Sequence, residues 1–149
     1  MKELLISALQ NGTAIDHIPT NSVFKIVEIL GLKDSPHEVS IATNLHSKKL
    51  GRKGIIKISS VFLDRSAIDA IALLAEGATI SIIKKYNVAK KQTIKIPGSV
   101  TGIVRCFNPN CITNHEQSIT KFAVIDKKDL KLRCHYCEKI TTEQTLKFL

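Results

Sequence analysis

The sequence has few aromatic residues, no tryptophan and no long apolar run. Aromatic residues make up 5% of its 149 residues, which counts against a base-stacking surface for single-stranded nucleic acid. No stretch approaches the roughly 20 apolar residues that span a bilayer. The apolar run within Met1–Ile6 is too short for a secretory signal. We therefore expect a globular, soluble protein of the cytoplasm.

Catalytic motifs are missing as well. The sequence holds no glycine-rich phosphate loop, no His-x-Glu metal motif and no Ser-His-Asp pattern beyond chance. We therefore predict that the chain is not an enzyme. Acidic residues are the minority charge, with 13 Asp and Glu against 22 Lys and Arg, which gives a formal net charge of +9. This balance favours anionic partners, such as nucleic acid, free nucleotides or an acidic protein surface.

Cysteine is absent from the first two thirds of the chain, and the last third holds four. They form two pairs, Cys106-x4-Cys111 and Cys134-x2-Cys137. Zn²⁺ favours four such soft ligands, and a closed four-thiolate shell leaves no open position for water or substrate. The spacing therefore predicts one structural zinc ion per chain, with His115 and His135 as non-ligands.

Two other uses of the cysteines remain open at this point. Two disulfides are the first, although disulfide frameworks belong mainly to short secreted chains. A redox Cys-x-x-Cys motif is the second, but it would not require the pair Cys106 and Cys111.

A break near Ile96–Ser99 divides the sequence into two domains, residues 1–96 and 97–149. The first is cysteine-free and alternates strand and helix patterns. Its expected elements are strands at 4–9 and 14–18, a helix that ends at Gly31, a strand over 39–45, a turn at Gly51–Gly54, a strand over 55–59, a helix with a capping box at Ser66 and Asp69 that ends at Gly77, and a strand over 78–86. This β-α-β-β-α-β order predicts an α+β, ferredoxin-like domain with a four-stranded antiparallel sheet and two helices on one face.

The second domain is expected to be a small all-β unit. Strands are predicted at 103–106, 122–125 and 130–134, with a hairpin turn at Asp126–Asp129. About 50 residues bury little apolar surface, so we expect metal binding to supply part of the folding free energy.

Lys57 stands out in the first domain because it lies between two isoleucines on a predicted strand. Its side chain leaves the strand on the face opposite to Ile56 and Ile58. If the isoleucines face the helices, Lys57 faces the open side, where an ammonium group can meet a phosphate. A single lysine on a strand is, however, usually only solvated.

Several motifs, taken together and in order, resemble one family. They are Ile15–Pro19 (IDHIP), Gly51–Lys53 leading into Ile56–Ile58, Cys106-x4-Cys111, and Cys134–Glu138. The chain resembles, nearly end to end, the regulatory chain of aspartate carbamoyltransferase. This resemblance implies a non-catalytic, allosteric subunit in pyrimidine biosynthesis whose N-terminal domain binds ATP or CTP at a shared site. It also implies a zinc domain that docks on the catalytic chain, and homodimers that bridge catalytic trimers.

The resemblance also implies a set of effector-binding residues. Lys57 and Lys91 would contact phosphates, with Lys90 as an open alternative to Lys91, and Asp16 would accept hydrogen bonds from ribose hydroxyls. Asp16 also has the simpler reading of a salt-bridge residue, and His17 that of a structural histidine. Ser81 stands where the family's pattern has Asn, which affects discrimination between purine and pyrimidine. The full set is Ala8, Leu9, Ala14, Asp16, His17, Lys57, Ser81, Ile83, Tyr86, Val88 and Lys91.

The main rival interpretation is a zinc-ribbon protein that binds nucleic acid. The chain's net charge of +9 is typical of proteins with such a function. Against it, the basic residues are scattered over both halves, and the only aromatic residues beside the cysteines are Phe107 and Tyr136.

Overall fold

The computed structural model describes residues 8–149 of the chain. The chain divides into two compact units, Met1–Lys95 and Ile96–Leu149. The strand expected at 4–9 falls almost wholly outside the described residues, and Ala8 and Leu9 precede the first described strand. No helix in residues 8–149 is both long enough and apolar enough to cross a membrane.

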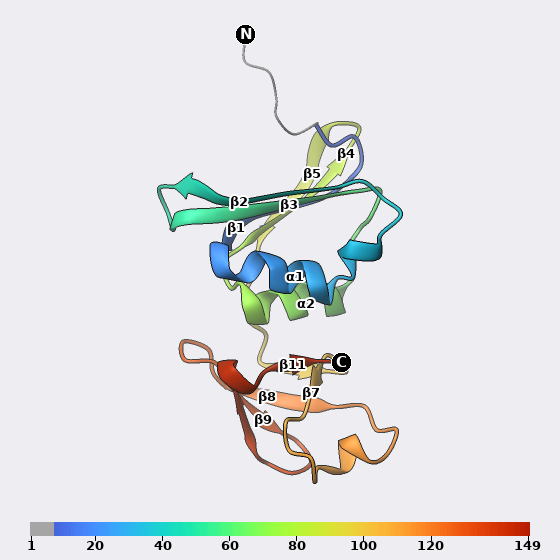
Figure 1. Ribbon diagram of the computed structural model, residues 1–149, viewed down its shortest axis with the longest axis vertical. Helices are drawn as coiled ribbons and strands as arrows, with labels where there is room; N and C mark the ends of the chain where they lie inside the picture. The colour runs from blue at the N-terminus through green and yellow to red at the C-terminus, as the bar shows by residue number, and fades with distance from the viewer. Residues whose placement is uncertain (1–7) are drawn as a thin grey trace. The chain divides into compact units, whose positions relative to one another are not determined.

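The first unit is a five-stranded antiparallel sheet with two α-helices on one face (Figure 1). The spatial order is β2-β3-β1-β4-β5. Its first four strands and two helices give the predicted β-α-β-β-α-β order, so the ferredoxin-like α+β class is confirmed. The elements are β1 Gly12–Pro19, α1 Val23–Ile29, β2 Val39–Ser47, β3 Gly51–Ser59, α2 Arg65–Leu74, β4 Thr79–Lys84 and β5 Asn87–Thr93, with short 3-10 turns at Thr20–Ser22 and Leu32–Asp34.

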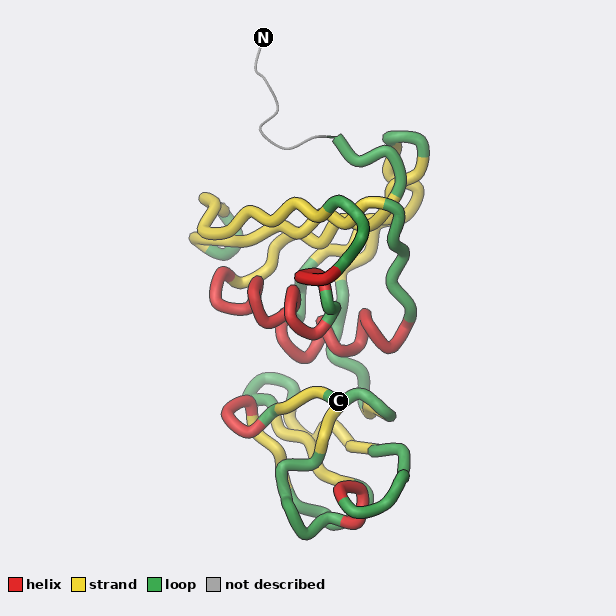
Figure 2. The backbone as a smooth tube through the Cα atoms, turned by 45° about the vertical axis from the view of Figure 1, so that its right-hand side comes forward, coloured by secondary structure: helices red, strands yellow, loops and turns green. Residues whose placement is uncertain are grey.

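The core of this unit lies between the sheet and the helices. Ile15, Ile56 and Ile58 are fully buried on the strands, as are Ile26 and Ile71 on the helices. Burial along β3 alternates as the sequence predicts, since Ile56 and Ile58 are inside and Lys57 is only half-buried. Figure 2 shows the helices, in red, together under the strands, in yellow. The other face of the sheet is therefore the one that carries Lys57.

The predicted turn at Gly51–Gly54 is wrong, because these residues open β3. Arg52 and Lys53 pair with His46 and Leu45 on β2. The chain reverses one step earlier, where the N–H of Leu50 donates to the Ser47 hydroxyl at 3.2 Å. Glycine in the sequence indicates a turn here, and Gly51 does adopt a positive φ of 77°, but at the end of the turn and at the first position of β3.

The predicted capping box of the second helix is also wrong. Asp64, in extended conformation, is the N-cap of α2, and its carboxylate accepts the N–H of Ala67 at 2.8 Å. Ser66 lies inside the first turn, and Asp69 instead pairs with Arg65 at 3.5 Å, one turn earlier on the helix. Asp64, two residues before Ser66, therefore caps the helix, because its carboxylate accepts one of the backbone N–H groups that have no partner within the first turn.

The fifth strand was not predicted. The expected strand 78–86 ends at Lys84, and a two-residue turn at Lys85 and Tyr86 leads into β5. Both residues have positive φ, 51° and 67°, which is the signature of a tight hairpin turn normally made by glycine or asparagine. Their N–H groups donate to the Asn11 side chain at 3.2 Å and to the Gln10 carbonyl at 2.9 Å. These contacts from a distant segment stabilise a turn that its own residues do not predict.

The second unit is all-β, as expected. Four strands form a sheet in the order β10-β9-β8-β6, and β7 pairs with β11. The strands are β6 Ser99–Thr101, β7 Val104–Arg105, β8 Lys121–Asp126, β9 Lys131–Cys134, β10 Ile140–Thr142 and β11 Lys147–Phe148, with 3-10 turns at Ile112–Asn114 and Glu143–Thr145. In the predicted hairpin turn, the Asp126 carboxylate accepts the N–H groups of Lys128 and Asp129, each at 3.0 Å.

The backbone of β1 predicts one position where any side chain destabilises the fold. Gly12 has a φ of 145°, and an added Cβ would overlap the carbonyl oxygen of Ile58 on β3. We expect Gly12→Ala to lower the free energy of unfolding by more than about 2 kcal/mol in urea denaturation. Gly98→Ala is the matched control, because its Cβ meets open space, and it should stay within about 0.5 kcal/mol. Equal stability of the two variants would contradict the assignment of this close approach.

Candidate effector face and metal centre

Four of the residues singled out from the sequence form one row across the open face of the first sheet. Lys57 on β3 pairs with Ala14 on β1, Ala14 pairs with Ser81 on β4, and Ser81 pairs with Lys91 on β5. Directly paired residues of neighbouring strands project on the same side of a sheet. The row therefore has a lysine at each end and two short side chains between them.

The register separates the two candidate lysines of β5. Lys91 is opposite Ser81, whereas Lys90 is opposite Ile82. Lys90 lines a small cavity together with Ile68 of α2 and Ile80, so it projects on the helix side of the sheet. Only Lys91 shares a face with Lys57.

Asp16 is held by a neighbour that the sequence did not identify. Its carboxylate lies 2.9 Å from the ammonium group of Lys53 and accepts the backbone N–H of His17. Burial raises the pKa of Asp16, but the hydrogen bonds from Lys53 and from His17 outweigh it, and the pKa falls below its usual value. The carboxylate is therefore ionised at neutral pH. Lys53 was missed because it was assigned to a turn, although strand alternation places it on the same face as Lys57.

His17 lies at an irregularity of β1, and its contact with an effector stays a prediction. It has a positive φ of 57° at a register shift between β1 and β3, which is the geometry of a β-bulge. Its Nδ1 lies 3.2 Å from the hydroxyl of Thr79 on β4. The bulge lets Ile15 and Ile18 both reach the core while Asp16 stays on the open face.

The remaining predicted residues lie around the β4–β5 hairpin. Ile83 pairs with Val88 through a register shift in β5, which puts Val88 on the same face as Lys91. Tyr86 at the hairpin turn is 64% exposed, and its N–H is engaged by Gln10. Through Gln10 the hairpin lies next to the segment of Ala8 and Leu9, of which Ala8 is exposed and Leu9 half-buried.

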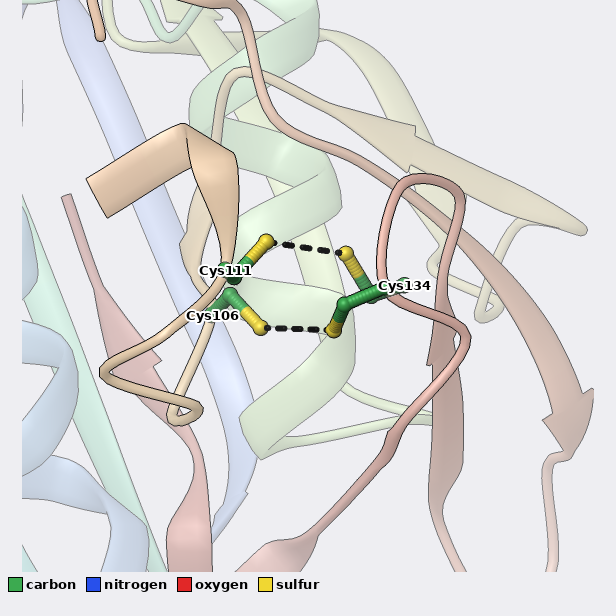
Figure 3. Close-up of side chains that lie close together, drawn as sticks. Cys106, Cys111 and Cys134 are labelled. Carbon is green, nitrogen blue, oxygen red and sulfur yellow. Dashed lines mark hydrogen bonds between the residues drawn. The ribbon is translucent and has the colours of Figure 1, made fainter. Parts of the chain in front are cut away.

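The four cysteines of the second unit converge on one point, and Figure 3 labels three of them, Cys106, Cys111 and Cys134. Their sulfur atoms all lie within 4.8 Å of one another, and the shortest contacts run between the two motifs, Cys106 to Cys137 at 3.6 Å and Cys111 to Cys134 at 3.7 Å. All four are free thiols, at contacts well beyond a disulfide bond. The cluster is the arrangement that holds a structural metal ion, and it includes neither His115 nor His135.

Local hydrogen bonds build the first cysteine loop. The Asn114 side chain donates to the carbonyl oxygens of Cys106 and Asn108, at 3.0 and 2.7 Å. A ring nitrogen of His115 lies 2.7 Å from the carbonyl oxygen of Pro109, so this histidine supports the loop from outside.

The protein environment already favours one thiolate. Burial raises the pKa of Cys106 and of Cys134. For Cys137 the backbone N–H of Lys139 and the side chain of Asn108 outweigh burial and lower the pKa to about 7. A metal ion binds deprotonated thiols. The hydrogen-bond donors around Cys137 reduce the free energy needed to deprotonate the first of the four.

Large apolar side chains surround the cysteine loops at the surface. Phe107, Ile112 and Tyr136 each neighbour a cysteine in sequence and are 41–45% exposed, and Ile119 is 69% exposed. The Tyr136 hydroxyl donates to the carbonyl of Ile119 at 3.2 Å, which ties the second cysteine loop to the segment before β8. Apolar groups gathered in this way mark a protein-interaction surface more often than a solvated one.

An α+β domain with a cationic open face, followed by a small β domain built on four thiols, defines a two-domain metal-binding protein. Residues 4–95 match the family model of the aspartate carbamoyltransferase regulatory chain, allosteric domain, and residues 98–147 match that of its metal binding domain. The chain belongs to the family of aspartate carbamoyltransferase regulatory chains.

Curated relatives in both archaea and bacteria carry that name. The regulatory chain of Thermococcus sibiricus is 48% identical over 143 residues, which cover 96% of this chain and 95% of the relative. That of Pyrococcus horikoshii is 47% identical over 148 residues, 98% and 97% of the two chains. That of Parabacteroides distasonis is 45% identical over 138 residues, 93% and 90%. The chain is thus a regulatory and not a catalytic subunit, its partner is the catalytic chain, and the zinc-ribbon nucleic-acid reading is not favoured.

The salt bridge of Asp16 predicts a pH dependence of stability. Because its pKa is lowered in the folded state, the ionised group stabilises the fold above the ordinary pKa near 3.8, and this contribution is lost as pH falls through the folded value. The side chain is about a third exposed, so we expect Asp16→Asn to cost about 0.2–1 kcal/mol at pH 7 and nothing near pH 2. Urea denaturation at both pH values measures this. Lys53→Gln should change stability in the same direction, and a penalty that grows on acidification would contradict the assignment.

Proposed function

We propose that the open face of the N-terminal sheet binds ATP and CTP at one shared site. The observation that carries this proposal is the row Lys57–Ala14–Ser81–Lys91. Two cations stand at the ends of a row whose inner side chains are short. An extended anion can lie along such a row and meet a positive charge at each end.

Each residue of the set takes a distinct role. Lys57 and Lys91 contact the phosphates, and Asp16, ionised and fixed by Lys53, accepts hydrogen bonds from ribose hydroxyls. Ala8, Leu9, Ala14, Ile83 and Val88 frame the base and the sugar, and His17 holds the bulge that positions Asp16. Backbone groups of Ile83 and Tyr86 read the base edge. For Tyr86 this group is the carbonyl, because its N–H already donates to Gln10.

Ser81 tunes the choice between nucleotides. It lies at the centre of the row, between Ala14 and Lys91. Its hydroxyl has one donor, where an asparagine amide has two. A base that needs two donors from this position is therefore bound less tightly.

The effector face is tested by replacing its two lysines, Lys57 on β3 and Lys91 on β5, and comparing them with Lys90 on the opposite face of β5. Lys57→Gln and Lys91→Gln each remove a charged contact worth about 1.5–3 kcal/mol, so we expect ATP and CTP to bind at least about tenfold more weakly in calorimetric titrations. Lys90→Gln is the matched control, since Lys90 projects on the helix side, and it should stay within about twofold. A larger effect of Lys90→Gln than of Lys91→Gln would contradict the assigned face.

We further propose that the metal is Zn²⁺, one per chain. A tetrahedron with Zn–S distances of 2.3 Å has S···S edges of about 3.8 Å. The contacts of 3.6 and 3.7 Å are close to this edge length, and all sulfur pairs lie within 4.8 Å, which supports this geometry. Zinc bound by Cys106, Cys111, Cys134 and Cys137 would have no open position, so its contribution is to folding.

The zinc domain, in this proposal, docks on the catalytic chain through the apolar residues around its cysteine loops. Pairing of two regulatory chains through their N-terminal domains then lets each dimer bridge two catalytic trimers. A nucleotide changes catalysis by binding one quaternary state better than the other, a coupling of typically about 1–3 kcal/mol. The complex would act in pyrimidine biosynthesis in the cytoplasm.

The metal proposal predicts that one ligand controls assembly. Cys134 is buried within the cluster, so Cys134→Ser should reduce bound zinc well below one ion per chain by atomic absorption. It should also abolish co-elution with the catalytic trimer. His115→Gln, beside the loop but outside the cluster, should keep both. Full-affinity assembly of Cys134→Ser in metal-free buffer would overturn the proposal.

A further inference from the structure

The outer face of the second sheet carries a hollow of about 320 Å³. One cross-strand row forms its floor, with Ser99 on β6 paired to Ala123 on β8, and Ala123 paired to Arg133 on β9. Two short side chains beside a long one leave a depression, and Lys121, two residues before Ala123, stands on the same face. Its volume lies at the lower end of the range of small-molecule sites.

Two cationic side chains, Lys121 and Arg133, stand at the rim of this hollow. Lys121, Arg133 and His135 line it, with Glu138 as its one acidic residue. All four side chains are exposed, and in residues 8–149 the ion pairs are Lys53–Asp16 and Arg65–Asp69. Neither Lys121 nor Arg133 is therefore neutralised by a carboxylate of the described chain.

The hollow adjoins the metal cluster, because Cys134 belongs to the cluster and also lines the hollow. Cys134 is buried, while Arg133 before it on β9 is exposed, so the thiol points to the interior and the guanidinium points outward. The N–H of His135 donates to the carbonyl oxygen of Lys121 at 2.8 Å. This backbone bond holds the residue after Cys134 next to Lys121 at the rim.

We propose that this hollow binds the phosphate group of a small phosphorylated molecule. The Arg133 guanidinium presents a planar fork of donors that matches two phosphate oxygens. Lys121 supplies a point charge and Ser99 a hydroxyl donor from the opposite side of Ala123. The remaining volume accommodates the organic part of the ligand. This proposal rests on the proposed function only in taking the zinc-loaded domain as the folded form.

Inorganic phosphate is the probe that tests the site. In the zinc-loaded full-length chain, amide NMR signals of Ser99, Ala123 and Arg133 should shift saturably on titration. The double variant Lys121→Gln/Arg133→Gln should weaken this binding at least about tenfold, with zinc content and the rest of the spectrum unchanged. Lys57→Gln is the matched control, because it removes a cation from the other unit and should leave these shifts intact.

Two outcomes would overturn the proposal. If the shifts are unsaturable or unaffected by the double variant, the basic residues only offset the charge of the thiolate cluster. If acetate binds as tightly as phosphate, the hollow recognises carboxylates and the assigned ligand class is wrong. Lys57→Gln tests the effector face, and Lys121→Gln/Arg133→Gln tests the hollow. A negative result at one site therefore does not affect the conclusion about the other.

Discussion

Strand alternation across a fixed register is the constraint on which both units depend. A residue of a β-strand projects to one side of the sheet only, so whatever buries one side decides what the other presents. In β3 the isoleucines lie under the helices, and Lys57 is thereby directed to the open face. In β9 Cys134 points inward to the metal cluster, and Arg133 is thereby directed outward. The cationic surfaces of the protein follow from what its strands bury.

The two units solve the problem of stability differently. The first buries aliphatic side chains between a sheet and two helices, and its open face needs no structural role. The second has a small core around Phe122 and Leu132. The apolar area that such a core buries is too small to stabilise about 50 residues by itself. A closed metal site compensates for this. Because such a site is rigid and chemically inert, the surface around it is suited to hold a partner chain.

Much of the fold and of the metal centre could be predicted from the sequence. The order of strands and helices, the alternation in β3 and the four-cysteine cluster all depend on short-range spacing. The missed fifth strand and the misplaced turn share one cause, which is that long-range contacts decided the local structure. The Lys85–Tyr86 turn is held by Gln10 and Asn11 from the start of the chain. Gly51 lies in a strand because β2 pairs with it.

The sequence by itself determined the class of each unit, the four thiol ligands and the face on which Lys57 lies. Only the tertiary structure decided that Lys91, and not Lys90, shares that face, and that Asp16 is held by Lys53. The physical reason is that spacing along one chain segment fixes side-chain direction within an element. The partners of a side chain depend on register between strands, and register is set by the packing of the whole sheet.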